Sequence, residues 1–234
     1  MIPKIIHYCW FGKNKYPAIV QKCVASWHKY CPDYEIKLWN EDNYDVKKNM
    51  YMIEAYKTKK WAFVSDFARL DIIYKEGGIY LDTDVELVRS LDDLLEEKCF
   101  VAGDGMGINT GLGFGAEKEH PVVKEMLDLY EGKHFITAGV PDLTPCTVLN
   151  TKPFLQAGYD IAAKQIFRMQ GAAVLPPEYF SPIEGIHSEL KITPNTHGIH
   201  WNSRLWETGL TRLKAKGRLL LGAKLVNKLK KIFK

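Results

Sequence analysis

The chain of 234 residues combines 46% hydrophobic with 26% charged residues, a composition typical of a folded protein with a substantial core. Its net charge of +4 is unevenly spread: residues 211–234 hold nine Lys or Arg and no acid, which leaves 23 basic against 28 acidic residues, or −5, elsewhere. This split argues against a nucleic-acid-binding core, whose basic groups should lie on the folded face that meets phosphates.

The cysteines and the N-terminal residues indicate the compartment. The five cysteines are odd in number and include no CxxC pair, so we expect neither a disulfide framework nor a zinc site. Residues 1–8 form a short apolar run without a basic leader, and we find no apolar stretch of about 18 residues that could span a membrane. We therefore expect a cytoplasmic protein.

The first third of the chain alternates strand and helix patterns. We expect strands at 4–8, 34–39 and 79–81, and helices at 17–30, near Tyr51, and from Phe63 to Tyr74. Gly77 and Gly78 should end the last of these helices. Such alternation is typical of an α/β fold with a mostly parallel central sheet.

The pattern continues beyond residue 90. We expect a short helix capped by Ser90, strands at 100–102 and 173–175, and a helix at 121–130. Residues 103–115 contain six glycines in thirteen positions, which predicts a loop and hairpin near a site. Because no internal repeat or low-complexity linker interrupts the chain, we expect one domain over 1–208 and a tail over 209–234.

Asp82 and Asp84 follow the predicted strand at 79–81. Alternate residues of an extended segment point the same way, so the two carboxylates should project together, roughly 6 to 7 Å apart. In open α/β sheets, ligands gather outside the carboxyl ends of the strands. Hard oxygen ligands select Mg²⁺ or Mn²⁺, although a DxD triplet alone is equally compatible with a polar turn.

The context of the triplet is more specific. Residues 65–69, Ser-Asp-Phe-Ala-Arg, and residues 76–84, Glu-Gly-Gly-Ile-Tyr-Leu-Asp-Thr-Asp, resemble the DXD sugar-binding region of the family-32 glycosyltransferases. This region also looks like the catalytic domain of the clostridial glucosylating toxins. The resemblance runs from Ile2 to the region of His200 and leaves out only the basic tail. It implies a single GT-A type domain, a nucleotide-sugar donor and retention of anomeric configuration.

The resemblance also implies roles for individual residues. Trp10 would stack on the nucleotide base, the alternative being a core aromatic. Asp66 and Arg69 would hold the donor's sugar and diphosphate, as a carboxylate and a guanidinium fork suit them to do, the alternative being a surface ion pair. Asp82 would contact the ribose or sugar and reach the ion through water, while Asp84 would ligate the ion directly.

Two further segments complete this predicted site. Asn109 would lie beside the sugar, or serve only as a turn residue. The segment from His197 to Trp206 looks like the His and Trp segment that closes the family's donor site, with Ser203 and Trp206 at the donor. His200 is our expected third metal ligand, but the pattern leaves open whether His197 takes that role or either histidine is structural.

The predicted activity is metal-dependent transfer from a nucleoside diphosphate sugar, UDP-linked in first place, to a glycan or lipid-linked saccharide in surface polysaccharide synthesis. The catalytic candidates are Asp66, Arg69, Asp82 and Asn109, with Mn²⁺ or Mg²⁺ as cofactor. No nucleophile is identifiable, so a front-face substitution is preferred. The alternatives are a non-catalytic sugar-nucleotide or glycan-binding protein and a toxin-like protein glucosyltransferase.

The basic tail is predicted separately. From Leu210 onward, apolar residues alternate with Lys and Arg in a pattern compatible with a basic amphipathic helix, which could contact an anionic membrane through residues 211–234. A terminal helix packed on the domain and an unstructured tail are the alternatives.

Overall fold

The centre of the molecule is a seven-stranded sheet in the order β2-β1-β3-β6-β5-β10-β9. The computed structural model describes residues 1–184 and 189–203. Strands β6 and β9 run opposite to the other five. The strands are β1 Ile5–Cys9, β2 Glu35–Trp39, β3 Gly78–Tyr80, β5 Cys99–Ala102, β6 Phe114–Ala116, β9 Phe167–Met169 and β10 Ala172–Leu175.

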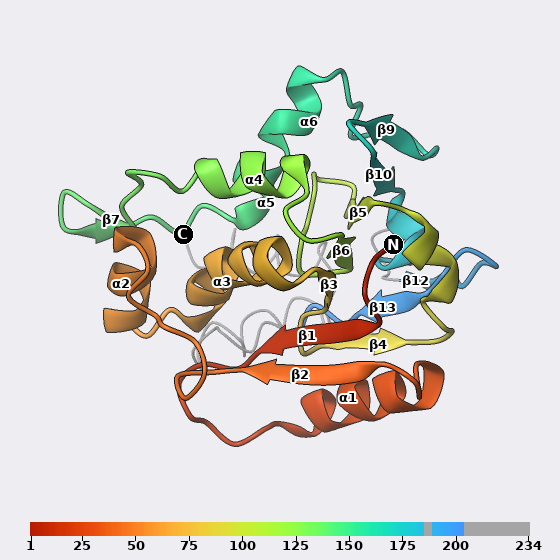
Figure 1. Ribbon diagram of the computed structural model, residues 1–234, viewed down its shortest axis with the longest axis horizontal. Helices are drawn as coiled ribbons and strands as arrows, with labels where there is room; N and C mark the ends of the chain where they lie inside the picture. The colour runs from red at the N-terminus through yellow and green to blue at the C-terminus, as the bar shows by residue number, and fades with distance from the viewer. Residues whose placement is uncertain (185–188, 204–234) are drawn as a thin grey trace, which may run out of the picture.

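Helices cover both faces of this sheet. In Figure 1, α1 lies beside β2, whereas α3 lies on the other side of β1 with α4 next to it. The helices are α1 Ala18–Tyr30, α2 Met50–Lys57, α3 Trp61–Glu76, α4 Pro121–Asp128, α5 Cys146–Asn150, α6 Lys152–Gln156, and the 3-10 turns η1 Asp92–Glu96 and η2 Pro177–Tyr179.

Three two-stranded ribbons complete the described structure. They pair β4 Val85–Leu87 with β13 Gly198–His200, β7 Ile136–Thr137 with β8 Val140–Pro141, and β11 Ile183–Glu184 with β12 Glu189–Leu190. The β4–β13 ribbon is antiparallel and joins positions more than a hundred residues apart in the sequence. It therefore brings the last described residues to the segment that follows β3.

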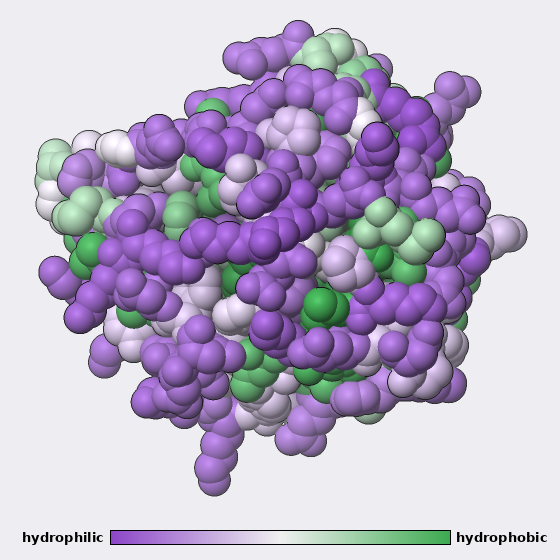
Figure 2. All heavy atoms as spheres, in the orientation of Figure 1, coloured by the Kyte–Doolittle hydropathy of each residue, from purple (hydrophilic) through white to green (hydrophobic). Residues whose placement is uncertain are grey.

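Successive side chains of the strands point alternately into two separate hydrophobic cores, one on each face of the sheet. In β5, Cys99 and Val101 belong to the core beneath α3 and α4, whereas Phe100 and Ala102 belong to the core beneath α1. The same alternation runs through β10. This is the arrangement expected of a sheet that is buried on both faces. Figure 2 shows that the surface seen in the view of Figure 1 is mostly hydrophilic, with small scattered apolar areas.

The connection from α3 to β3 fixes the start of the acidic triplet. Gly77 and Gly78 both adopt positive φ, and a Cβ on Gly78 would lie 2.7 Å from His7 Nε2. The Trp39 indole donates to His7 Nδ1 at 3.0 Å, so His7 Nε2 carries the proton and donates to the Gly77 carbonyl at 2.9 Å. Burial lowers the pKa of His7 to about 4, so the imidazole is neutral at physiological pH.

The elements predicted in the first 130 residues are found with ends shifted by one or two residues, and the predicted α/β fold class with a mostly parallel sheet is confirmed. The expected loop and hairpin at 103–115 leads into β6. Ser90 Oγ accepts from Asp92 N at 3.2 Å, although the N-cap residue of η1 is Leu91 and not Ser90. The predicted tail over 209–234 lies outside the described residues. Within the described part, no helix is long and apolar enough to cross a membrane, and all five cysteines are free thiols.

Candidate active site

Asp82 and Asp84 occupy a turn between β3 and β4, at the carboxyl end of β3 as predicted. The Val85 amide donates to the Asp82 carbonyl at 3.0 Å, which closes the turn. The Asp82 amide donates to the Gly111 carbonyl at 2.8 Å, which ties the turn to the glycine-rich loop. Both backbone bonds limit where the two carboxylates can point.

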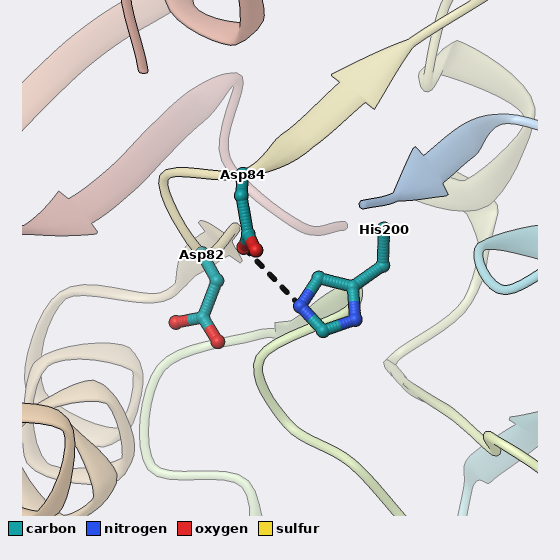
Figure 3. Close-up of side chains that lie close together, drawn as sticks. All are labelled: Asp82, Asp84 and His200. Atoms are coloured by element: carbon teal, nitrogen blue, oxygen red, sulfur yellow. Dashed lines mark ion pairs between the residues drawn. The ribbon is translucent and has the colours of Figure 1, made fainter. Parts of the chain in front are cut away.

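His200 joins these carboxylates through the β4–β13 ribbon. The register places His200 opposite Val85, and His200 Nε2 lies 3.2 Å from Asp84 Oδ1. Figure 3 shows Asp84 and His200 pointing toward each other from their two strands, with Asp82 alongside. One ligand atom from each of the three side chains lies within 4.8 Å of the others. The three predicted metal ligands are thus brought together.

Ser203 holds the other oxygen of Asp84. Its amide and its hydroxyl each donate to Asp84 Oδ2 at 2.7 Å. Burial alone would raise the pKa of Asp84, but the charge of His200 and the bonds from His200 and Ser203 outweigh burial and lower it to about 2. Burial would lower the pKa of His200, yet Asp84 outweighs that effect and raises it. Asp84 is therefore ionised, and it favours a cation at its side.

Asp66 and Arg69 form a buried pair rather than a surface one. Their side chains are only 8% and 3% exposed, and an Arg69 nitrogen donates directly to Asp66. The same guanidinium lies 3.6 Å from Asp82 Oδ2 and over the Tyr80 ring, 5.2 Å from its centroid. Arg69 therefore links α3 to the acidic triplet, as the sequence spacing implied.

The protonation of this cluster follows from its burial. Burial raises the pKa of Asp66 to about 6 although Arg69 opposes the shift. Burial opposes the charge on Arg69, but the carboxylates of Asp82 and Asp66 keep its pKa well above the ordinary value. The Tyr80 hydroxyl donates to Asp82 Oδ1 at 3.1 Å. The charged guanidinium held between two carboxylates places a fixed positive charge beside Asp82, and such a charge attracts phosphate oxygens.

Trp10 follows β1 at the same edge of the sheet as Asp82, because His7 of β1 pairs with Tyr80 of β3. Its indole donates to the Asn14 carbonyl at 2.7 Å and packs edge-on against Tyr16, with ring centroids 5.0 Å apart. Trp10 is partly exposed and belongs to neither core. The core-aromatic alternative does not describe this residue.

The structure gives the positions of Asn109 and of the two histidines. Asn109 Oδ1 accepts from the Gly111 amide at 3.0 Å, so its side chain shapes the turn that adjoins Asp82. His197 is buried, 2.9 Å from Asp93 Oδ1, and stacked on Tyr179. His197 therefore holds structure together, and His200 is the histidine beside the carboxylates. Trp206 lies outside the described residues.

Sequence reasoning missed a clasp that joins Lys22, Glu86 and Trp201. Glu86 Oε2 accepts from the Trp201 indole at 2.8 Å and from the Lys22 ammonium at 2.6 Å, and Lys22 also lies over the Trp201 ring. The residues come from α1, β4 and the segment after β13. Nothing local in the sequence links them, since they meet only when β13 pairs with β4.

Comparison with solved structures defines the class of fold. The chain aligns with the structure of "PaToxG Glycosyltransferase" at a TM-score of 0.51 and 18% identity, covering 67% of this chain and 70% of that one. A likeness at this identity shows a shared fold. The described residues therefore have a glycosyltransferase fold of the GT-A type, with an acidic triplet at the carboxyl end of a central strand.

Comparison of sequences shows which proteins this chain resembles. Residues 17–101 match the model of the glycosyltransferase sugar-binding region containing the DXD motif, a span that includes Asp66, Arg69, Asp82 and Asp84. "Inositol phosphoceramide mannosyltransferase 3" of Schizosaccharomyces pombe is 34% identical over 139 residues, which is 54% of this chain and 36% of that protein. Human "Alpha-1,4-N-acetylglucosaminyltransferase" is 35% identical over 77 residues, 32% of this chain and 22% of that protein.

The chain spans well under half the length of these curated relatives. The span of the family model includes the helix and the turn that build the site. The chain is similar to DXD-containing glycosyltransferases over that span, and the resemblance seen in residues 65–84 is confirmed.

Proposed function

We propose that this protein transfers a sugar, with retention of configuration, from a nucleoside diphosphate sugar to a glycan or lipid-linked saccharide, with a divalent cation as cofactor. UDP is the first choice of nucleotide and GDP the second. The observation that carries the proposal is the convergence of Asp82, Asp84 and His200 within 4.8 Å beside the buried Arg69. The S. pombe relative, by its name, joins a mannosyl group to a lipid, which supports a lipid-linked acceptor.

The three side chains suit a divalent cation. Two carboxylates and one imidazole offer oxygen and nitrogen donors, a set that favours Mn²⁺ over Mg²⁺, because Mg²⁺ prefers oxygen ligands and retains its waters. Such an ion, when bound, neutralises the charge that grows on a departing diphosphate. His200 would have to be neutral to serve as a ligand, so protons would compete with the ion for its imidazole nitrogen.

The neighbouring residues supply binding and orientation. Arg69 presents a fixed positive charge beside Asp82, and the buried carboxylate of Asp66 accepts from sugar hydroxyls. Trp10, at the edge of the sheet, offers a partly exposed ring face to the nucleotide base. Asn109, Ser203 and Trp206 complete the donor site in this proposal. We prefer a front-face substitution, in which the leaving diphosphate helps to deprotonate the acceptor.

The proposal predicts that Asp84→Asn loses Mn²⁺-supported sugar transfer by roughly 100-fold or more, because the substitution removes a direct ligand. The measurement is calorimetric titration with UDP, GDP and their sugars, with and without Mn²⁺, alongside donor hydrolysis. Asp128→Asn, which removes an exposed carboxylate of α4, is the matched control and should behave as the unaltered protein.

Normal turnover in a folded Asp84→Asn protein would refute the metal site. Donor binding without any hydrolysis or transfer would favour the binding-protein alternative. Failure of every sugar nucleotide to bind in a metal-dependent way would refute the proposed function as a whole.

A further inference from the structure

The short helix α5 touches both sides of the candidate donor site. Cys146 and Asn150 are four residues apart and so share one face of the helix. The Cys146 thiol hydrogen-bonds the Asp66 carboxylate. Asn150 Nδ2 donates to Thr110 Oγ1 at 2.9 Å, and both of these side chains are fully buried. One helical face therefore contacts the α3 carboxylate and the glycine-rich loop together.

Gly111, the residue after Thr110, packs directly against the Asp82 side chain. A Cβ on Gly111 would lie 2.0 Å from Asp82 Oδ2 and 2.7 Å from an Arg69 guanidinium nitrogen, so no space separates this backbone from the two charged groups. The Gly111 carbonyl also accepts from the Asp82 amide at 2.8 Å. Any displacement of Thr110 must therefore move Gly111, and with it Asp82.

A second contact holds the same loop at its other end. The hydroxyl of Thr151, the residue that follows α5, accepts from the Ile108 amide at 2.8 Å. A Cβ on Gly107 would lie 2.4 Å from this hydroxyl oxygen. Asn150 and Thr151 thus contact residues 107–110 from one side of the loop. Asp82 and Arg69 pack against Gly111 on the other side.

The Asn150 side chain lowers the stability of the fold compared with an apolar side chain in the same place. Its Oδ1 is buried and has no hydrogen-bond partner among the described residues. An unsatisfied buried acceptor lowers stability, and an apolar side chain of similar size would avoid that cost. Stability alone therefore does not explain an amide at this position.

We infer that Asn150 is a positioning residue, which acts through Thr110 and Gly111 to fix Asp82 in the ion and donor site. The part of this inference that concerns turnover rests on the proposed function, whereas the part that concerns the position of Asp82 rests on the contacts alone. Groups that orient the residues around a metal typically change metal affinity or activity by 10- to 100-fold when they are removed.

The test compares Asn150→Leu, Thr110→Val, the double variant and Thr110→Ser, which keeps the hydroxyl. We expect Asn150→Leu and Thr110→Val each to weaken Mn²⁺ binding and lower kcat by roughly tenfold, with the double variant no worse than either and Thr110→Ser close to the unaltered protein. Since removal of Oδ1 offsets the lost hydrogen bond, the Tm of Asn150→Leu should shift by no more than about 4 °C. Tyr34→Phe, which deletes a hydroxyl bond to Asp92 outside the site, should change neither binding nor kcat.

Hydrogen exchange measured by mass spectrometry gives a readout that needs neither metal nor activity. In Asn150→Leu, exchange should accelerate in the peptides covering both 103–113 and 78–88, because the Asp82 amide bonds to Gly111. Acceleration confined to 103–113, or unchanged Mn²⁺ affinity with a lowered Tm, would show a merely structural Asn150 and overturn the inference. A protein that binds no sugar nucleotide but shows exchange in both peptides would refute the proposed function and keep the positioning role.

Discussion

The imidazole of His200 lies beside Asp84 in the place where a cation is expected. Asp84 accepts three interactions, one from His200 and two from Ser203, and each favours its ionised form. A carboxylate held in this way is oriented before any ligand binds. The positions of these side chains therefore suit the ion that we propose.

The pH dependence of ion binding follows from this pair. The pKa of His200 is raised above its ordinary value of 6.5, so protons compete with Mn²⁺ at mildly acidic and neutral pH. We predict that Mn²⁺ affinity, measured by calorimetry, increases as the pH rises above the ordinary histidine pKa of 6.5, and that His200→Gln removes most of this dependence. His134→Gln, an exposed histidine paired with Glu54, is the control. An unchanged pH profile in His200→Gln would contradict the assignment.

Folding stability without a bound ion depends on pH in the opposite direction to Mn²⁺ affinity as far as His200 is concerned. Because the folded pKa of His200 is raised, its pairing stabilises the fold fully below the unfolded pKa, and this contribution is lost as the pH rises through the folded value. The lowered pKa of Asp84, about 2, contributes stability that is present above pH 4 and lost as the pH falls toward 2.

For single residues, the sequence predicted the positions of the two carboxylates better than the choice of histidine. The shared direction of Asp82 and Asp84 follows from local backbone geometry, which a strand pattern conveys. The choice of His200 over His197 depends on the register of β13 against β4, because a shift by one residue would turn His200 away from Asp84. No local pattern encodes that register.

Among the elements, the β4–β13 ribbon and α1 together hold the last described residues at the site. The Trp27 indole of α1 donates to the Val85 carbonyl at 2.8 Å, and the clasp of Lys22, Glu86 and Trp201 fastens the segment after β13. The Trp201 amide also donates to the Asp84 carbonyl at 3.0 Å. His200 and Ser203 lie on either side of this clasp and depend on it for their positions.

We predict that Glu86→Gln weakens Mn²⁺ binding by about fivefold, since it removes the charge that attracts Lys22 and weakens the bond from Trp201. The loss should shrink at high salt, because Lys22 is half exposed and its attraction is screened. The measurement is Mn²⁺ titration at low and high ionic strength. Glu76→Gln, which breaks the exposed pair with Lys37, is the control, and an equal effect of the two substitutions would argue against the clasp.

The sequence predicted the long elements and missed several of the short ones. Helices α1 and α3 contain enough turns for an apolar period to appear, and paired glycines mark the end of α3. Strands β4 and β13 have three residues each, and α5 has five, which is too short for any period. These short elements are formed by tertiary contacts, and they carry the parts of the site that the sequence left open.

At the scale of the whole molecule, the charge is divided between the described domain and the terminal segment. Residues 211–234 hold nine of the 32 Lys and Arg, whereas Asp66, Arg69, Asp82, Asp84 and His200 all lie within residues 1–208. We propose that the domain over 1–208 carries donor binding and that the tail over 209–234 attaches it to the cytoplasmic face of a membrane. Acceptors linked to lipid would then be close to the site.

Deletion of residues 211–234 should release the protein from vesicles that contain anionic lipid and leave transfer to a soluble acceptor within about twofold of the full chain. Each basic residue near such a surface contributes about 1 kcal/mol, so the loss should be large at low salt and absent with neutral lipid. Sedimentation with vesicles of both compositions measures it. A variant with the tail lysines replaced by Gln separates charge from apolar contact, and equal sedimentation of the truncated protein would exclude the anchor.

The pairing of β13 with β4 has a consequence for biosynthesis. The ribosome delivers Asp82 and Asp84 more than a hundred residues before His200 and Ser203, so the acidic turn is synthesised well before the residues that pair with it. A nascent chain stopped before residue 198 lacks the imidazole and the Ser203 donors. The proposed ion site is therefore assembled only after His200 has been synthesised, and a chain that stops earlier holds only two of the three proposed ligands.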